Sequence, residues 1–339
     1  MLFRILKNVE MVNKKYEGLT EKYKYNPVSL NDKRSRRMFS GIETQHLYSK
    51  EDKVWSDGKL RRHVYWYPVR YREYKKRNQN NNDEYKCVEY TENERKKYGN
   101  EIPESVNVLG ETCYFCEWSL TSITIPPNVC CIGDKCFEGC IGLITINIPT
   151  TVSSIGKNCF SGCYSLTSIS VPSRVSSIDE ECFYECSSMT SISIPPNVSY
   201  IGDKCFEGCR SLSTVCIPMS TREIGRTCFY NCMSMTSISL PTSVSRISEW
   251  CFQNCTSLTS IVIPRSVSRI GDKCFYGCVS MSSLSIPTSV SFIGDNCFGG
   301  CLSMTSLTIP SSFSSKIEDL FKEWHGNRGV PSRCHITYT

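Results

Sequence analysis

The sequence predicts an α/β-type solenoid in which each coil of 23 residues contributes one short parallel β-strand. The main observation is a C-F-x-x-C motif that returns at a constant spacing, without insertion or deletion. Apolar positions between the motifs recur with the same period. A fixed period of 20 to 50 residues is typical of stacked repeats, each of which buries its apolar face against its neighbours. The motifs begin at Cys136, Cys159, Cys182, Cys205, Cys228, Cys251, Cys274 and Cys297.

The strand of each coil is predicted by the pattern L-x-x-I-x-I, which is typical of the short strand of leucine-rich repeats. In the coil that starts at Leu258, we expect Leu258, Ile261 and Ile263 to point inward. Pro264 follows and lacks an N–H, so the strand ends there. Gly271 is expected to turn a corner by adopting backbone angles that other residues resist.

The C-F-x-x-C stretch predicts about one helical or 3-10 turn on the convex side of each coil, with both cysteines on one face. Stacked coils lie about 4.8 Å apart, so nine coils would form a rod of roughly 45 Å. The phenylalanines are then expected to stack into a spine, with Tyr114 at its head.

The repeat L-T-S-I-x-I-P-x-x-V-x-x-I-G-x-x-C-F-x-x-C resembles the BspA-like leucine-rich repeat of the 23-residue type, over about Ile102 to Pro310. That family usually carries alanine before the phenylalanine, where this chain carries cysteine. Known members are bacterial surface adhesins and proteins expanded in single-celled parasites, so the resemblance implies protein–protein contact. The segments similar to the N-terminal half of amoebic members are Lys14–Tyr16, Tyr25–Pro27, Ile42–Thr44 and Tyr98–Pro103.

Four regions are expected: a helical basic head (1–40), irregular N-terminal cap strands (41–101), regular repeats (102–310) and a C-terminal cap (311–339). Helical spacing predicts one or two helices over 2–23, and 91–98 reads as a short helix with Thr91 or Asn93 near its cap. Phe321 stands where a repeat phenylalanine is due, and 334–338 can form a last strand. The segments that alternate like strands are 41–48, 64–74 and 85–90.

Charge is uneven along the chain. Residues 1–100 hold 24 Lys and Arg against 14 Asp and Glu, a balance of +10, and the remainder holds 15 against 19, a balance of −4. Basic runs at 33–37, 61–63 and 75–77 are interleaved with aromatic residues and could meet phosphate. No nucleic-acid motif accompanies them, so we expect a solvated basic face and no nucleic acid as partner.

The expected compartment is cytoplasmic, with nuclear and peripheral-membrane locations as alternatives. The first nine residues do not read as a secretory signal, because their apolar stretch is short and interrupted by Arg4 and Lys7. No window approaches 18 apolar residues, so no membrane span is expected. We expect a monomer.

The 23 cysteines are interpreted as buried free thiols that donate weakly to loop carbonyls along the stack. Disulfides are the first alternative, although the count is odd and equivalent side chains in adjacent coils point the same way. Zinc binding is the second alternative, because thiolates two to four residues apart suit zinc. However, a structural zinc site needs a closed set of four ligands, and the repeat cysteines form continuous columns. No metal and no cofactor are expected.

Two surfaces are candidate binding sites. The residue before the inward isoleucine varies from coil to coil and supplies arginine and aromatic side chains, which protein interfaces favour. The outward strand positions carry Thr and Ser instead, which form either a structural hydroxyl ladder or a surface for a repetitive partner. The first surface includes Tyr200, Glu223, Arg246, Arg269 and Phe292, with Trp250 and Arg265 nearby. The second includes Thr167, Ser168, Thr190, Ser191, Thr236, Ser237, Thr259 and Ser260.

Catalysis is not expected. The four histidines (His46, His63, His325, His335) lie outside the regular coils, and no phosphate-binding glycine loop or hydrolase motif is present. The leading hypothesis is therefore a non-enzymatic scaffold that binds a protein partner and no small-molecule substrate. Two alternatives are a ubiquitin-ligase substrate adaptor, because residues 9–19 look like the later part of an F-box, and a cell-surface adhesion protein like the bacterial relatives.

Overall fold

The computed structural model describes residues 23–77, 82–322 and 330–339. The expected helices over 2–23 and the F-box-like stretch at 9–19 therefore lie outside the described residues. The described chain divides into two compact units, one with residues 23–90 and 105–108 and the other with residues 91–104 and 109–339.

The first unit is built from short parallel strands and two helices. Strand β1 (Thr44–Leu47) pairs with β2 (Arg62–Tyr65), which pairs with β4 (Glu84–Tyr85). Strand β3 (Val69–Arg70) pairs with β5 (Val88–Tyr90), again in parallel. Two small apolar clusters stabilise this unit, and they consist of Leu30, Phe39 and Ile42, and of Leu47, Tyr65 and Val69.

The helices of the first unit correct one prediction. Helix α3 (Tyr71–Arg77) occupies part of the stretch 64–74 that alternates like a strand, so strand structure there ends at Arg70. The basic run at 33–37 forms most of helix α2 (Lys33–Met38), whose capping box is made by Asp32 and Ser35. Arg36 is buried and pairs with Asp57 at 2.7 Å, so this run is only partly a solvated face.

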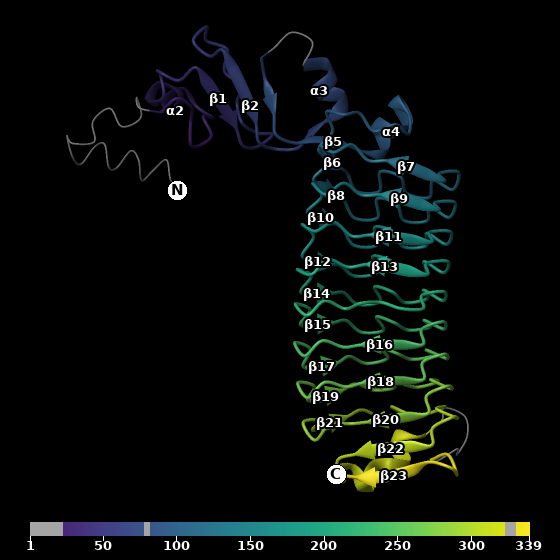
Figure 1. Cartoon of the computed structure of the whole chain (residues 1–339). Coiled ribbons are helices and arrows are strands. Elements are labelled where there is room, and N and C mark those ends of the chain that lie inside the picture. The colour runs from purple at the N-terminus through teal and green to yellow at the C-terminus, as the bar shows by residue number, and fades with distance from the viewer. Residues whose placement is uncertain (1–22, 78–81, 323–329) are drawn as a thin grey trace, which may run out of the picture. The chain divides into compact units, whose positions relative to one another are not determined.

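The second unit is the predicted solenoid, and its coils stack regularly in Figure 1. One column of strands follows the L-x-x-I-x-I pattern and pairs in parallel, as Ser122 with Thr145 and Ser168 with Ser191 show. Its strands are β7 (Ser122–Thr124), β9 (Thr145–Asn147), β11 (Ser168–Ser170), β13 (Ser191–Ser193), β16 (Ser237–Ser239), β18 (Ser260–Val262), β20 (Ser283–Ser285) and β22 (Ser306–Ile309). Between β13 and β16, this column contains only the isolated bridge between Cys216 and Ser239.

A second column of two-residue strands lies before the corner position, which is glycine in most coils, and the expectation of one strand per coil missed it. Its strands also pair in parallel with a shift of 23 residues, as Arg246 with Arg269 shows. They are β8 (Cys131–Ile132), β10 (Ser154–Ile155), β12 (Ser177–Ile178), β14 (Tyr200–Ile201), β15 (Glu223–Ile224), β17 (Arg246–Ile247), β19 (Arg269–Ile270) and β21 (Phe292–Ile293). Strand β6 (Val108–Leu109) precedes this series in the chain.

The C-F-x-x-C segments form hydrogen-bonded turns in which no helix is assigned. Lys135 and Gly139 both have positive φ, of 55° and 72°, and left-handed residues so close together interrupt a right-handed helix. The segment bonds to the next coil instead, with Phe137 N donating to Cys159 O at 2.9 Å and Gly139 N donating to Ser161 O at 2.8 Å.

The phenylalanine spine is confirmed. Tyr114 stacks on Phe137 with ring centroids 5.2 Å apart, and the rings from Phe137 to Phe275 follow at 5.4 to 5.6 Å with interplanar angles of 8° or less. These rings are fully buried. The spine places the coils in one register, so a residue in any coil lies beside its counterpart 23 positions away.

The corner glycines have a different role from the one predicted. Gly156, Gly225 and Gly271 do not have positive φ. A Cβ at Gly225 would lie 2.4 Å from Asp203 N, and one at Gly271 would lie 2.4 Å from Glu249 N. Glycine is needed there because the backbones of adjacent coils approach too closely for a side chain.

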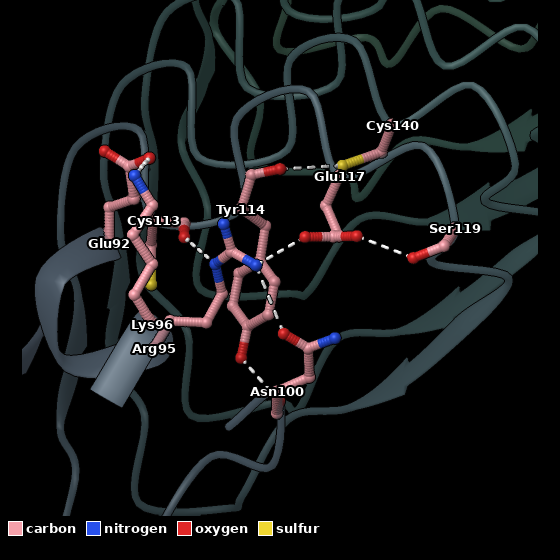
Figure 2. A network of polar contacts seen from close by, with 9 residues as sticks. All are labelled: Glu92, Arg95, Lys96, Asn100, Cys113, Tyr114, Glu117, Ser119 and Cys140. Atoms are coloured by element: carbon pink, nitrogen blue, oxygen red, sulfur yellow. Dashed lines mark hydrogen bonds and ion pairs between the residues drawn. The ribbon is translucent and has the colours of Figure 1, made fainter. Parts of the chain in front are cut away.

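Helix α4 (Glu92–Tyr98) begins after Thr91 as predicted, and its Arg95 covers the first coil (Figure 2). Arg95 is buried, donates to Cys113 O at 2.7 Å and pairs with Glu117. Glu117 stands 23 residues before Cys140, so it occupies the place of a second repeat cysteine. Cys116 is exposed and stands in the left-handed position that glycine takes in most later coils, as at Gly139 and Gly162.

The other end of the solenoid agrees with the predicted ending of the repeat. Phe298 N donates to Leu320 O at 2.7 Å, and the Phe321 ring lies 5.6 Å from that of Phe298. Strand β23 (His335–Tyr338) pairs with β22 as the last strand. Between them lie the 3-10 helix η3 (Ser311–Lys316) and helix α5 (Ile317–Leu320).

Candidate functional site

The five variable-edge residues of the sequence analysis lie on consecutive coils. Tyr200 pairs with Glu223 across β14 and β15, and Arg246, Arg269 and Phe292 align across β17, β19 and β21. Each side chain precedes a buried isoleucine and therefore points outward. The 23-residue register converts a variable position in the sequence into a continuous strip on the surface.

This strip forms one wall of a groove of about 550 Å³, here called the edge groove. A second row of side chains, three positions further along each coil, forms the other wall. Sequence reasoning did not select this row as a whole, although its residues directly follow the corner position and are charged in every regular coil. The second row consists of Asp203, Arg226, Glu249 and Asp272, with Gly225, Ile247, Ser248 and Gly271 between the rows.

Most charges in the edge groove are paired. Arg246 forms an ion pair with Glu223, and Arg226 forms one with Glu249, each to an adjacent coil. Such exposed pairs contribute little to stability because water screens them, so a partner can replace them at little cost. The pKa of Arg226 is raised, mainly by its hydrogen bond to Glu249.

Arg269 differs from the other two arginines. Among the described residues it has no carboxylate within 4.0 Å, and its guanidinium lies 4.3 Å above the ring of Phe292. Phe292 is itself 37% exposed. An arginine stacked on an exposed aromatic ring offers a planar donor for a carboxylate and an apolar surface beside it.

The aspartates of the second row mainly hold the coils together. Asp203 accepts a hydrogen bond from Arg226 N at 2.7 Å, and Asp272 accepts one from Asp295 N at 3.1 Å. Tyr200 faces the same end of the groove. Its pKa is raised, first by burial and then by the carboxylates around it, beginning with Asp203. Its hydroxyl is therefore a neutral donor at physiological pH.

Trp250 extends the candidate site sideways. Arg226, which lines the edge groove, lies with its guanidinium 5.9 Å from the Trp250 ring. Trp250 in turn lines a hollow of about 330 Å³ with Glu207, Thr227, Tyr230, Gln253 and Lys273. Six of the seven predicted edge residues therefore belong to one connected surface. Arg265 is exposed but lines neither hollow.

The Thr and Ser strand positions are exposed as expected, but their first column has a structural role. Thr190 Oγ1 donates to Thr167 O at 3.3 Å, and Thr259 Oγ1 donates to Thr236 O at 3.3 Å. The hydroxyl ladder thus runs from side chain to backbone carbonyl rather than between hydroxyls. The next column, with Ser168, Ser191, Ser237 and Ser260, is exposed and uncharged.

The repeat cysteines are buried and protonated. Cys232 Sγ donates to Phe206 O at 3.2 Å, and the same contact recurs along the stack, as from Cys255 to Phe229 O. Burial raises the pKa of Cys232 well above its ordinary value. All 23 cysteines lie in the described part of the chain and all are free thiols. Among the described residues, no group of three or more His, Cys, Asp or Glu is placed to hold a metal ion.

Comparison with known proteins identifies the family. The BspA type leucine-rich repeat region matches residues 107–236 and 222–325 in six copies. The match covers more than half of the 339 residues, so the chain belongs to the BspA-type leucine-rich repeat family. A search of curated proteins finds no match. No helix among the described residues is long and apolar enough to cross a membrane.

Several solved structures are similar to this chain. One is a leucine-rich repeat protein of T. pallidum, 23% identical, covering 64% of this chain and 88% of its own, with a TM-score of 0.47. Another, a leucine-rich repeat protein from Bacteroides ovatus, is 23% identical. The match covers 70% of this chain and 83% of that protein, with a TM-score of 0.33. A leucine-rich cell surface protein of Faecalibacterium prausnitzii is 22% identical. The match covers 80% of this chain and 83% of that protein, with a TM-score of 0.38.

Proposed function

We propose that this protein is a non-enzymatic scaffold that binds a protein partner through the edge groove and the adjoining Trp250 surface. The observation that carries the proposal is the convergence of three arginines with Tyr200, Trp250 and Phe292 on one connected surface. Arginine, tyrosine and tryptophan are the residues most enriched at energetic centres of protein interfaces.

The charges of the groove favour a protein over a nucleic acid. Four carboxylates (Asp203, Glu223, Glu249 and Asp272) face three guanidinium groups, so the lining has a formal charge of −1. A polyphosphate backbone requires a clear positive excess. A protein segment with an acidic side chain for Arg269 and apolar neighbours for Phe292 meets this surface better.

The cysteine chemistry supports a non-enzymatic role in a reducing compartment. A thiol acts as a nucleophile only as thiolate, and burial keeps the repeat thiols protonated. Free thiols in this number are typical of the cytoplasm or nucleus. We therefore include a cytoplasmic location and independence from cofactors in the proposal. The adaptor and adhesion hypotheses remain predictions from the sequence.

A charge reversal within the groove tests the proposal, and the chain offers a matched control. Arg269 and Arg265 lie four residues apart and both are exposed, but only Arg269 lines the groove. We expect proximity labelling and affinity capture to recover a partner with the wild-type chain and with Arg265→Glu. The same partner should be lost with Arg269→Glu and with Phe292→Ala.

Each variant must first show an unchanged melting temperature, so that loss of binding is not loss of folding. Recovery of the same partners by Arg269→Glu and the wild-type chain would contradict the proposal. An equal loss with Arg265→Glu would indicate a general charge effect and would contradict it as well.

A further inference from the structure

A second candidate surface lies on the first three coils, at the position that follows the second cysteine of the repeat motif or its replacement. There the chain places Trp118, Ile141 and Tyr164, which are 66%, 41% and 49% exposed. Ile144, three residues after Ile141, is 48% exposed. Ile144 takes the place of Thr167 and Thr190 in the first column of outward strand positions. The edge groove includes none of these four residues, here called the apolar patch.

Contacts between coils place Trp118, Ile141 and Tyr164 of the apolar patch in one row. Ile144 N donates to Thr121 O at 3.0 Å, and Thr167 N donates to Ile144 O at 3.2 Å, so the second coil lies between the first and the third. A Cβ at Gly142 would lie 2.5 Å from Trp118 O, which brings the turn of Ile141 directly against that of Trp118. Trp118, Ile141 and Tyr164 therefore follow one another along the solenoid axis.

The turn that carries Trp118 is held in place on both sides (Figure 2). Glu117 accepts hydrogen bonds from Arg95 and from Ser119 Oγ, the latter at 2.6 Å. Glu117 and Ser119 are the two neighbours of Trp118 in the chain. The most exposed tryptophan of this surface thus projects from a fixed turn, and preorganisation of this kind reduces the entropy lost on binding.

The size of the apolar patch identifies the kind of occupant. Its four side chains together expose roughly 400 Å², taking aromatic side chains as offering up to about 250 Å² each. Stable interfaces bury about 800 Å² on each partner. The patch is too small to hold two copies of this chain together, but it is large enough to anchor a single helix.

The spacing of the coils also favours a helix. Ring centroids of the spine lie 5.2 Å apart between the first two coils and 5.4 Å apart between the second and third. An α-helix advances 5.4 Å per turn, whereas side chains on one face of a strand repeat at about 6.6 Å. A helix parallel to the solenoid axis places one side chain against each coil, and an extended peptide loses register within two coils.

We propose that the apolar patch binds an amphipathic α-helix of a protein partner, which lies along the solenoid axis with one apolar side chain per turn against each of the first three coils. Beyond Tyr164 the same position becomes polar, as Ser187 and Arg210. These two residues line a hollow of about 580 Å³ with Tyr164, Tyr184 and Glu185. The helix should therefore present polar residues in its next two turns.

The probe for this proposal is a displayed library of 18-residue peptides. Half are helical designs with apolar residues at i, i+4 and i+7 and polar residues at i+11 and i+14, and half are extended designs interrupted by proline. The full chain serves as target. Enriched peptides are then synthesised and their affinity for the full chain is measured by fluorescence anisotropy. We expect helical designs to be enriched, and Trp118→Ala to weaken their binding at least tenfold.

Leu302 provides the matched control, because it occupies the same repeat position in the last regular coil and is 55% exposed. Leu302→Ala should leave the affinity within twofold, and so should Arg269→Glu, which separates this surface from the edge groove. Enrichment of extended designs, absence of enrichment, or binding insensitive to Trp118→Ala would overturn the proposal. A concentration-dependent dimer in sedimentation that Trp118→Ala abolishes would also overturn it, in favour of a second copy.

Discussion

Alkaline pH should unfold this protein much earlier than an ordinary domain, because sixteen thiols are buried in protonated form. The two cysteines of each C-F-x-x-C motif are almost fully shielded from solvent. Burial raises the pKa of every one of them above the ordinary value of 9.0. It raises that of Cys140, Cys251 and Cys301 to about 12, and that of the other thirteen is also raised.

The direction of the effect follows from which state holds the protons. Below about pH 8 both the folded and the unfolded chain keep these thiols protonated, so the thiols leave stability nearly unchanged. Above about pH 8 the unfolded chain releases protons that the folded chain retains, so stability falls as pH rises. Each thiol lowers the free energy of unfolding by about 0.4 kcal/mol at pH 9 and about 1.4 kcal/mol at pH 10.

Summed over sixteen thiols, the loss is about 6 kcal/mol at pH 9 and about 20 kcal/mol at pH 10, as an upper limit because thiolates in the unfolded chain repel one another. Domains are usually stable by about 5–15 kcal/mol. We therefore expect the solenoid to lose its fold between about pH 9 and pH 10.

The assay is urea unfolding followed by circular dichroism at half-unit intervals from pH 7 to pH 10, with a reductant present throughout. The slope of stability against pH near pH 9 should correspond to about eight protons. Cys232→Ala should reduce this slope by a fraction of one proton, because burial raises the pKa of Cys232 well above its ordinary value. A slope of fewer than about two protons would refute the reasoning, since it would mean that burial does not hold the thiols protonated.

Three further predictions concern packing, and each is checked by urea unfolding at pH 7. Phe229→Ala should lower the free energy of unfolding by about 3–5 kcal/mol, because the Phe229 ring stacks on both neighbours at 5.5 Å. Phe321→Ala, at the end of the spine, should have a smaller effect; equal effects would contradict the role of two-sided stacking. Arg95→Met should lower the free energy of unfolding by about 3 kcal/mol, because a buried carbonyl and a carboxylate lose their donor. Arg95→Lys should lower it less, because lysine keeps a charged donor. If Arg95→Met left the free energy of unfolding unchanged, the first coil would need no cover. Gly225→Ala should lower it by about 1–3 kcal/mol, more than Gly41→Ala, whose added Cβ would have no neighbour within 4 Å.

The repeat itself could be predicted from the sequence because each coil is nearly a copy of the last. Copying fixes the register, so the spine from Tyr114 to Phe298 and the inward isoleucines follow from a spacing of 23. The last strand at His335–Tyr338 was also predictable, since the chain resumes an apolar pattern after the repeat ends. The family resemblance pointed to the same architecture, and the match over 107–325 confirms it.

The roles of individual positions were less predictable. Gly225 resembles a residue chosen for its backbone angles, yet the close approach of Asp203 N is what requires it. Cys116 resembles a repeat cysteine, but counting from Tyr114 gives that place to Glu117. The pattern Cys113-Tyr114-x-x-Glu117, aligned on the aromatic residue rather than on the second cysteine, would have revealed this substitution.

The candidate surfaces show where sequence and tertiary structure each contribute. The solenoid, the burial of the cysteine columns and the outward direction of Tyr200, Arg269 and Phe292 can be predicted from the residues alone, because they depend on local patterns repeated at one period. Which outward residues share a surface becomes known only from the folded chain. The edge groove combines two rows from adjacent coils, and the apolar patch joins residues 23 positions apart. Such neighbourhoods depend on coil stacking, which a one-dimensional reading of each coil does not contain.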